Sequence, residues 1–253
     1  MARISIQDLE LASRCFKRLS LSKLYPNMAQ PRPLKVRTDN VPMMSQAIHY
    51  AYATKDNTPV PLVRIATRLE NLCIDTAGDI KDPQVFASAI GRAWHIRDKF
   101  SVWYKNIYLK DTRDFYPDLE LDTEITGSSY MYGVIPFIAV DTHNMRLDIF
   151  EVSQEVITGD AMWDDIITRL RILLLYKHLG KLPTSVERLI VSNTGVKSQK
   201  MKINSLQYAQ SFITDTLKMA QHLARGIEKD VSYPSFNEQC NTCLFRHNNI
   251  CKF

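Results

Sequence analysis

The sequence lacks long apolar runs, internal repeats and low-complexity tracts. Its apolar stretches, such as the one in "RILLLYKHL" at residues 171–179, are well short of the roughly 20 residues that a membrane-spanning helix needs. The N-terminal "MARISIQDLELASRC" has no apolar core of the kind found in secretory signals. We therefore expect a cytosolic protein without membrane contact, in which paired cysteines serve as metal ligands or redox groups before they form disulfides.

The composition is that of a globular protein with a substantial core. The chain has 253 residues, of which 45% are hydrophobic and 23% charged, enough for one large domain or one domain with small appendages. The net charge of +5 is uneven, because residues 1–38 carry eight basic side chains and only two acidic ones. Such an imbalance suits a surface that contacts phosphate, although a solvated helix face gives the same count.

The hydrophobic pattern changes period along the chain. Helical spacing predicts helices at 5–24 with Ser5 as N-cap, and at about 40–54, 60–74, 83–107, 160–180 and 204–230. Alternation and β-branched residues predict an antiparallel meander at 118–127, 133–141 and 146–154, and a short strand at 186–195. The proline-rich segment 25–36 and the basic segment 196–202 are interpreted as a connector and a solvated loop. This order predicts a mixed α/β domain with one central sheet.

Three of the five cysteines lie in "QCNTCLFRHNNIC" at residues 239–251. Two sulfurs in a C-x2-C turn can face one metal centre, but Cys240, Cys243 and Cys251 leave one ligand position open. His247 would complete a tetrahedral zinc site, whereas Cys15 would complete an all-thiolate set suited to an iron–sulfur cluster or to zinc. The remaining alternative is reduced thiols without a metal. We interpret Cys73 as a small buried core residue.

"CNTCLFRHNNIC" resembles the C-terminal cluster motif of the iron–sulfur branch of the RecB-type nucleases, within the PD-(D/E)XK superfamily, and "ASRCFKRLSL" resembles its N-terminal element. The resemblance implies a [4Fe–4S] cluster that joins both ends of the chain around a nuclease-like α/β core. Its ligands would be Cys15, Cys240, Cys243 and Cys251, with His247 as a bystander. The implied division is a helix and basic connector at 1–38, a helical region at 39–115, the nuclease-like core at 116–230 and the cysteine tail at 231–253.

The same resemblance extends to the nuclease motifs, but with departures. "AIGRAWHIRDKF" resembles the G-x-x-x-H helix and implies His95 as a metal-binding histidine, while "LDIFEVSQ" resembles the D/E-x-K strand and implies Glu151 as a metal-binding carboxylate. Pro136 occupies the place of the metal-binding aspartate, and Ser153 that of the catalytic lysine. These nucleases need both carboxylates to hold Mg²⁺ or Mn²⁺, and the lysine to stabilise developing charge. Both losses predict a vestigial active site.

The helix "RLRILLLYKHL" resembles the family helix that follows the D/E-x-K strand. Tyr176 fits the tyrosine of that helix, and the family's glutamine is absent. Lys177, Arg169 or Arg171 on this helix could provide a replacement cation, and Glu151 on its own would be expected simply to pair with Arg169 or Arg171.

We therefore expect an iron–sulfur protein of nuclease-like fold that is catalytically inactive and serves as a structural, assembly or nucleic-acid-handling subunit. Its partners would be another protein, or DNA or a single-stranded nucleic acid, in the cytoplasm of a bacterium or a virus-infected host cell. One alternative is an active Mg²⁺- or Mn²⁺-dependent DNA nuclease with relocated residues. Another is a zinc protein that binds a partner through Cys240, Cys243, His247 and Cys251.

Overall fold

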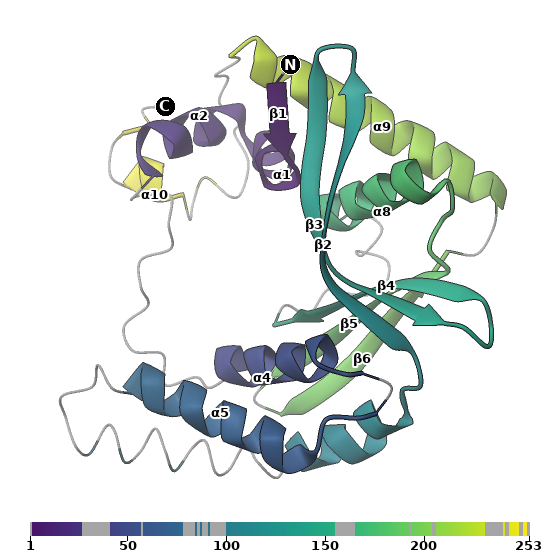
Figure 1. The fold of residues 1–253 in the computed structure, drawn as a ribbon. Helices are drawn as coiled ribbons and strands as arrows, with labels where there is room; N and C mark the ends of the chain where they lie inside the picture. The colour runs from purple at the N-terminus through teal and green to yellow at the C-terminus, as the bar shows by residue number, and fades with distance from the viewer. Residues whose placement is uncertain are drawn as a thin grey trace.

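The fold is a mixed six-stranded sheet with helices on both sides (Figure 1). The computed structural model describes residues 2–26, 41–56, 58–77, 84, 87, 91, 100–154, 165–192, 194–203, 206–230, 240, 243–247 and 250–251. Its elements are β1 (Ala2–Ser5), α1 (Ile6–Arg14), α2 (Phe16–Leu24), α4 (Val41–Ala53), α5 (Leu62–Ala77), the 3₁₀ turn η1 (Tyr108–Lys110), β2 (Asp114–Thr126), β3 (Ser129–Asp141), β4 (Arg146–Ser153), α8 (Ile166–Leu179), β5 (Ser185–Ser192), β6 (Gly195–Lys202), α9 (Leu206–Glu228) and α10 (Leu244–His247). Among the described helices, none has both the length and the apolar character needed to cross a membrane.

Strand β3 organises the sheet. It pairs with β2 in antiparallel fashion along its length, and its other edge is shared by two strands. Near the start of β3 that edge pairs with β1 in parallel, and near its end it pairs with β4 in antiparallel fashion. Helix α8 connects β4 to the parallel strand β5, and β6 returns antiparallel beside β5. The predicted mixed α/β class with one central sheet and an antiparallel meander is confirmed.

Two hydrophobic clusters cover the faces of the sheet. One packs α1, α8 and α9 against the sheet and contains Ile149, and the other packs α4, α5 and the helical residues 100–106 and contains Phe150. Neighbouring residues of β4 thus enter different clusters, because successive side chains of a strand point to opposite faces. Burial on both faces explains why β4 and β5 are apolar along most of their length.

The long β2–β3 hairpin twists sharply at its centre. Ile135 and Phe137 are two positions apart and should share one face, yet they belong to different hydrophobic clusters. On β2 the same place is marked by Asp118, whose φ of 49° lies in the left-handed region. Opposite it stands Pro136, which offers no N–H to a neighbouring strand. The crossing of the two strands is visible in Figure 1.

The N-terminal segment differs from the prediction of one helix at 5–24. The expected N-cap is confirmed, because the Ser5 side chain accepts a hydrogen bond from the Asp8 N–H at 2.9 Å. The helix is then interrupted at Cys15, whose extended backbone separates α1 from α2. The short parallel strand β1 was not expected, since its pairing with β3 depends on residues more than 120 positions away.

The prediction of a loop at 196–202 is wrong, because this segment forms the edge strand β6. Its Met201 is buried, while Lys197, Lys200 and Lys202 are exposed. Exposed lysines are a common way of protecting a sheet edge from pairing with another chain. Helix α8 ends at Gly180 with φ of 65°, as expected. The expected helices at 40–54, 60–74 and 204–230 are confirmed, whereas most of 25–36 and 83–99 lies outside the described residues.

Candidate functional site

Glu151 lies where β3 and β4 stop pairing. The last paired residues are Phe137 and Phe150, so Pro136 and Glu151 each stand one position beyond the end of the ladder. The missing N–H of proline explains why pairing stops there. Glu151 is only 8% exposed, and on its other side it is paired with Arg188 of β5. A carboxylate buried to this degree requires a charged or hydrogen-bonding partner.

Two arginines provide those partners. Arg188 contacts one carboxylate oxygen of Glu151, and Arg171 of helix α8 contacts the other. Arg171 also donates its Nε–H to the backbone carbonyl of Val134 at 3.3 Å. Val134 lies in the part of β3 between the segments that pair with β1 and β4, so Arg171 occupies the gap between these two strands. Both oxygens of Glu151 are therefore held by guanidinium groups.

Asp165 extends this charged cluster at the N-terminus of α8. It is the N-cap residue and accepts a hydrogen bond from the Thr168 N–H at 3.1 Å. Nη2 of Arg188 donates to Asp165 and to the Thr168 hydroxyl, both at 2.6 Å. Burial alone would raise the pKa of Asp165, but the hydrogen bonds from Thr168 and Arg188 hold that pKa below its usual value. Two carboxylates and two guanidinium groups thus alternate and carry no net charge. We call Glu151, Asp165, Arg171 and Arg188 the arginine-locked cluster.

The structure distinguishes among the residues expected near Glu151. Of the helix cations, Arg171 reaches the carboxylate, while Arg169 donates to the Thr216 hydroxyl at 3.2 Å and lies over the Phe212 ring. Ser153 is two positions beyond Glu151 on β4 and faces the same side. His95 lies outside the described residues.

Arg188 was missed by the sequence reasoning, although a signal for it exists. A charged residue inside the otherwise buried strand "SVERLIVS" must be paired in the fold. The same applies to its neighbour Glu187. What the strand alone does not reveal is the partner, which depends on the register between β4 and β5.

Asp148 belongs to a separate buried cluster on the opposite face of the sheet. It accepts from Arg113 at 3.2 Å, from Ser185 at 2.6 Å and from Lys200 at 3.2 Å. Arg113 also forms an ion pair with Glu187 at 2.9 Å. Burial opposes the charge on Arg113, but hydrogen bonding to Asp111 and the charge of Glu187 raise its pKa above the usual value. Asp148 is therefore no substitute for the missing second carboxylate beside Glu151.

Cys15 is built into the start of helix α2. It is the N-cap residue, and its sulfur accepts a hydrogen bond from the Arg18 N–H at 3.4 Å. Helix N-termini favour negative groups because their first N–H groups are unpaired and the helix dipole is positive there. N–H groups directed at cysteine sulfur also tune thiolate-bound metal clusters.

The other three cysteines surround the short helix α10. The Cys243 N–H donates to the Cys240 carbonyl at 3.4 Å, and the Cys251 N–H donates to the Phe245 carbonyl at 3.0 Å. The Phe245 side chain is buried and anchors this turn. Figure 1 shows α10 beside α2, so the last described turn of the chain lies near the helix that Cys15 caps.

Cys251 lies within electrostatic range of the other three cysteines of the proposed set. The pKa of Cys251 is raised, first by burial, then by the thiols of Cys243 and Cys15, with a smaller contribution from Cys240 and an opposing one from Lys17. Within the described part of the chain, however, no three His, Cys, Asp or Glu side chains are grouped closely enough to hold a metal ion. The side chains of His247 and Cys73 lie outside that part.

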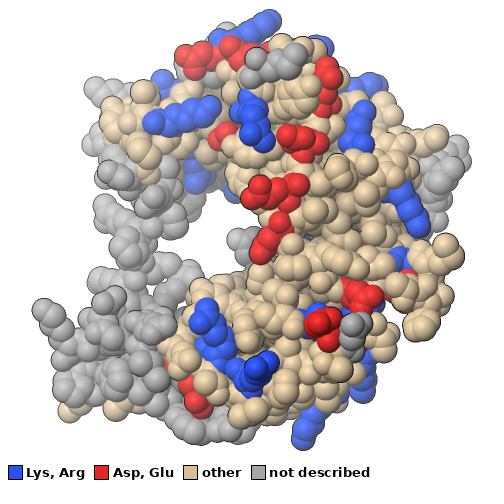
Figure 2. All heavy atoms as spheres, viewed as in Figure 1, with Lys and Arg blue, Asp and Glu red and all other residues tan. Residues whose placement is uncertain are grey.

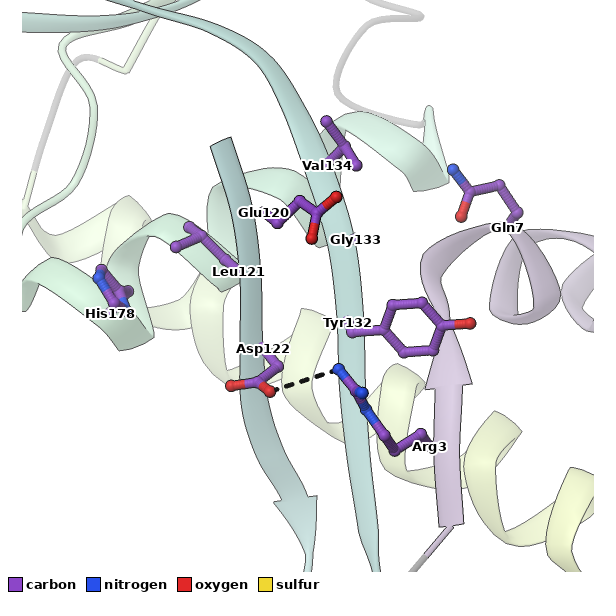
Figure 3. A pocket seen from close by; sticks show the side chains of 9 residues that line it. All are labelled: Arg3, Gln7, Glu120, Leu121, Asp122, Tyr132, Gly133, Val134 and His178. Carbon is purple, nitrogen blue, oxygen red and sulfur yellow. Dashed lines mark ion pairs between the residues drawn. The ribbon is translucent and has the colours of Figure 1, made fainter. Parts of the chain in front are cut away.

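A groove of about 470 Å³ opens on the uncovered face of β1, β2 and β3 (Figure 3). Its lining residues are Arg3, Gln7, Glu120, Leu121, Asp122, Tyr132, Gly133, Val134 and His178. Arg3 and Asp122 form an ion pair at 3.6 Å across this groove. Gly133 permits the close approach of α1, because a Cβ there would lie 2.6 Å from the Ile6 side chain. No local sequence pattern predicts this groove.

Comparisons with known proteins identify no family. No family model and no curated protein matches the sequence. A solved structure described as "Crystal structure of SSO0001" is similar with a TM-score of 0.44 and 13% identity, over 99% of this chain and 85% of that chain. A likeness of this degree carries no conclusion about function.

Proposed function

We propose that this chain is an iron–sulfur protein of nuclease-like fold that has lost catalysis and serves as a structural or assembly subunit. The observation that carries the proposal is the pairing of Glu151 with both Arg171 and Arg188. The resemblance implies Glu151 as a metal ligand, and in this chain both of its oxygens already bind cations.

Electrostatics argues against a divalent metal at this place. Two unit charges 4 Å apart interact by about 4 kcal/mol at an effective dielectric constant of 20, and a divalent ion doubles that repulsion for each arginine. Mg²⁺ also needs a near-octahedral set of oxygen ligands. Pro136 supplies no side-chain oxygen where the resemblance expects a carboxylate, and Asp165 is already bonded to Arg188. The arginine-locked cluster thus supports stability in place of metal binding.

The cysteines supply the second part of the proposal. Burial, and after it the neighbouring thiols, raise the pKa of Cys251, so its thiolate is favoured only beside a positive partner. This donor set suits a cluster that binds thiolates, and the Arg18 N–H at Cys15 adds a suitable hydrogen bond. When bound, a [4Fe–4S] cluster would supply a covalent connection between the first helices and the last turn.

Zinc is the competing occupant of the cysteine site. The resemblance implies a set that includes Cys15, whereas the side chain of His247 lies outside the described residues. Both iron–sulfur clusters and zinc accept four thiolates, so metal content has to be measured. Iron and zinc analysis with a visible absorption spectrum, on protein purified without oxygen, separates the two because zinc has no visible absorption.

Nuclease assays on the same preparation test the loss of catalysis. We expect no cleavage of single- or double-stranded DNA with Mg²⁺ or Mn²⁺. Cleavage that the Glu151→Gln variant abolishes would overturn the proposal and favour the active nuclease. An iron-free, zinc-containing preparation would instead favour the zinc protein.

A further inference from the structure

We propose that the groove between β1, β2 and β3 binds a lysine or arginine side chain on a basic segment of a protein partner. The groove differs in chemistry from the arginine-locked cluster, because its two carboxylates are exposed and, in the described part of the chain, only Asp122 has an arginine partner, Arg3. Neither the cysteine site nor the loss of catalysis is needed for it, so it stands apart from the function proposed above.

The face of the sheet that carries the groove is open. Along β2, the side chains of Leu121 and Ile125 are buried against the helices, and the alternate ones of Asp118, Glu120, Asp122 and Glu124 are exposed. On β3, Tyr132 belongs to the same open face and is 38% exposed. Figure 2 shows acidic side chains gathered on this part of the molecule, beside its hollow. A sheet face that combines an aromatic ring with negative charge suits a cationic ligand.

Two of these carboxylates line the groove itself. Glu120 and Asp122 are separated by one residue and point to the same face of β2. Like charges at neighbouring positions of a sheet face disfavour one another. Among the described residues, Asp122 has an ion-pair partner in Arg3, and none forms such a pair with Glu120. A further positive charge would therefore relieve repulsion that Arg3 only partly offsets.

Arg3 shows which chemistry the groove accepts. Its guanidinium lies 5.0 Å from the centre of the Tyr132 ring and 3.6 Å from the Asp122 carboxylate. Figure 3 shows the three side chains converging from three adjacent strands. The Tyr132 ring and the Asp122 carboxylate together form a binding site for a cation. Arg3 is itself 67% exposed, so it occupies only one side of a groove of about 470 Å³ and leaves room toward Glu120.

The charge of this face selects the class of partner. Exposed carboxylates repel the phosphates of a nucleic acid, whose binding depends on positive protein groups. A bare divalent ion finds no group of three suitable ligands among the described residues. A basic protein segment satisfies both carboxylates and stacks on Tyr132, and its binding should weaken with added salt.

The test uses the full-length protein and a blocked peptide in which arginine alternates with glycine and serine, with a glutamine-for-arginine peptide as its control. Calorimetric titration at low and physiological salt measures the affinity. We expect Glu120→Gln and Asp122→Asn each to weaken binding about threefold, and the double variant roughly tenfold. Tyr132→Ala should also weaken it while Tyr132→Phe retains it. Glu124→Gln, on the same strand face outside the groove, is the matched control and should change nothing.

The Arg3→Ala variant gives a result of opposite sign. It frees Asp122 and Tyr132 for the peptide, so affinity should rise about threefold. The proposal is overturned if the double variant binds the arginine peptide as well as the natural chain does, or if the glutamine peptide binds equally. It is also overturned if no variant changes peptide binding.

Discussion

Arg171 on helix α8 and Glu151 on strand β4 form an ion pair at the gap between β1 and β4, which pair with different parts of the same edge of β3. The same guanidinium holds the carbonyl of Val134 in the unpaired part of β3. One side chain thus neutralises a buried carboxylate and closes a gap in the sheet. In the proposed account, this arginine stands near the position in which an active relative would bind its metal.

Removal of Arg171 should destabilise the fold. Arg171→Met leaves Glu151 with one cation in place of two and the Val134 carbonyl without its donor. Breaking a buried pair costs roughly 3 kcal/mol, so the midpoint of urea unfolding should fall accordingly. In the double variant with Glu151→Gln, part of the loss should return, because no buried charge is left unpaired. Equal stability of Arg171→Met and the natural protein would show that the pair contributes little.

Restoration of the missing nuclease groups should fail while Arg171 is present. The variant Pro136→Asp with Ser153→Lys adds the carboxylate and the lysine that the resemblance implies. We expect it not to bind Mn²⁺ in electron paramagnetic resonance titrations, because Arg171 and Arg188 still occupy Glu151. Further substitution of Arg171 by glutamine frees the Oε2 atom of Glu151, because Arg188 contacts only Oε1, and should produce measurable Mn²⁺ binding. Binding by the first variant alone would contradict the proposed role of the arginine.

Loss of Cys15 should release the metal and loosen both ends of the chain. We expect Cys15→Ser to lower the iron content and visible absorption strongly, and to expose residues near α2 and α10 to limited proteolysis. The central sheet should remain resistant, since α2 contributes only Leu19 and Phe16 to its hydrophobic clusters. Cys73→Ser is the matched control, because Cys73 belongs to α5 and is outside the proposed ligand set. Unchanged iron in Cys15→Ser would remove this residue from the site.

Stability should fall in acid partly through Asp165. Its pKa in the folded protein lies below the usual value, so the stabilisation is fully present above the unfolded pKa and is lost as pH falls through the folded one. Urea midpoints measured between about pH 5 and pH 2 should therefore decline less steeply in Asp165→Asn. Asparagine remains an effective N-cap, so helix α8 should persist in the variant. Parallel pH profiles for the two proteins would exclude this contribution.

A substitution at Gly226 of α9 tests how closely α9 packs against Phe16, the residue that follows Cys15. A Cβ at this position of α9 would lie 2.5 Å from the ring of Phe16, the residue after Cys15. Overpacking costs about 1–3 kcal/mol, and the better helix propensity of alanine returns only about 1 kcal/mol. Gly226→Ala should thus lower thermal stability, and adding Phe16→Leu should restore it. A more stable single variant would show that Phe16 moves aside freely.

Much of the fold follows from local sequence signals. The meander of β2, β3 and β4 combines alternation with tight turns, and α8 has a clear end at Gly180. The break at Cys15 was missed because the helical spacing continues through it. It depends on α1 packing beside β3 and on the sulfur that caps α2. Strand β6 was missed because a lysine-rich segment has the composition of a solvated loop. It forms a strand because its backbone hydrogen-bonds to β5.

The candidate site was predictable only in part. Pairing between Glu151 and Arg171 follows from a buried carboxylate and a helix that begins soon after its strand. Arg188 requires the parallel register of β4 and β5, and the groove at Asp122 requires β1 beside β3. Both are set by distant segments, so no local pattern reveals them.

The most direct test of the account is Mn²⁺ binding by the natural protein, purified without oxygen and followed by electron paramagnetic resonance with DNA cleavage measured in parallel. We expect no stoichiometric Mn²⁺ site that depends on Glu151, and no cleavage. A stoichiometric site that Glu151→Gln removes, together with cleavage lost in the same variant, would contradict it.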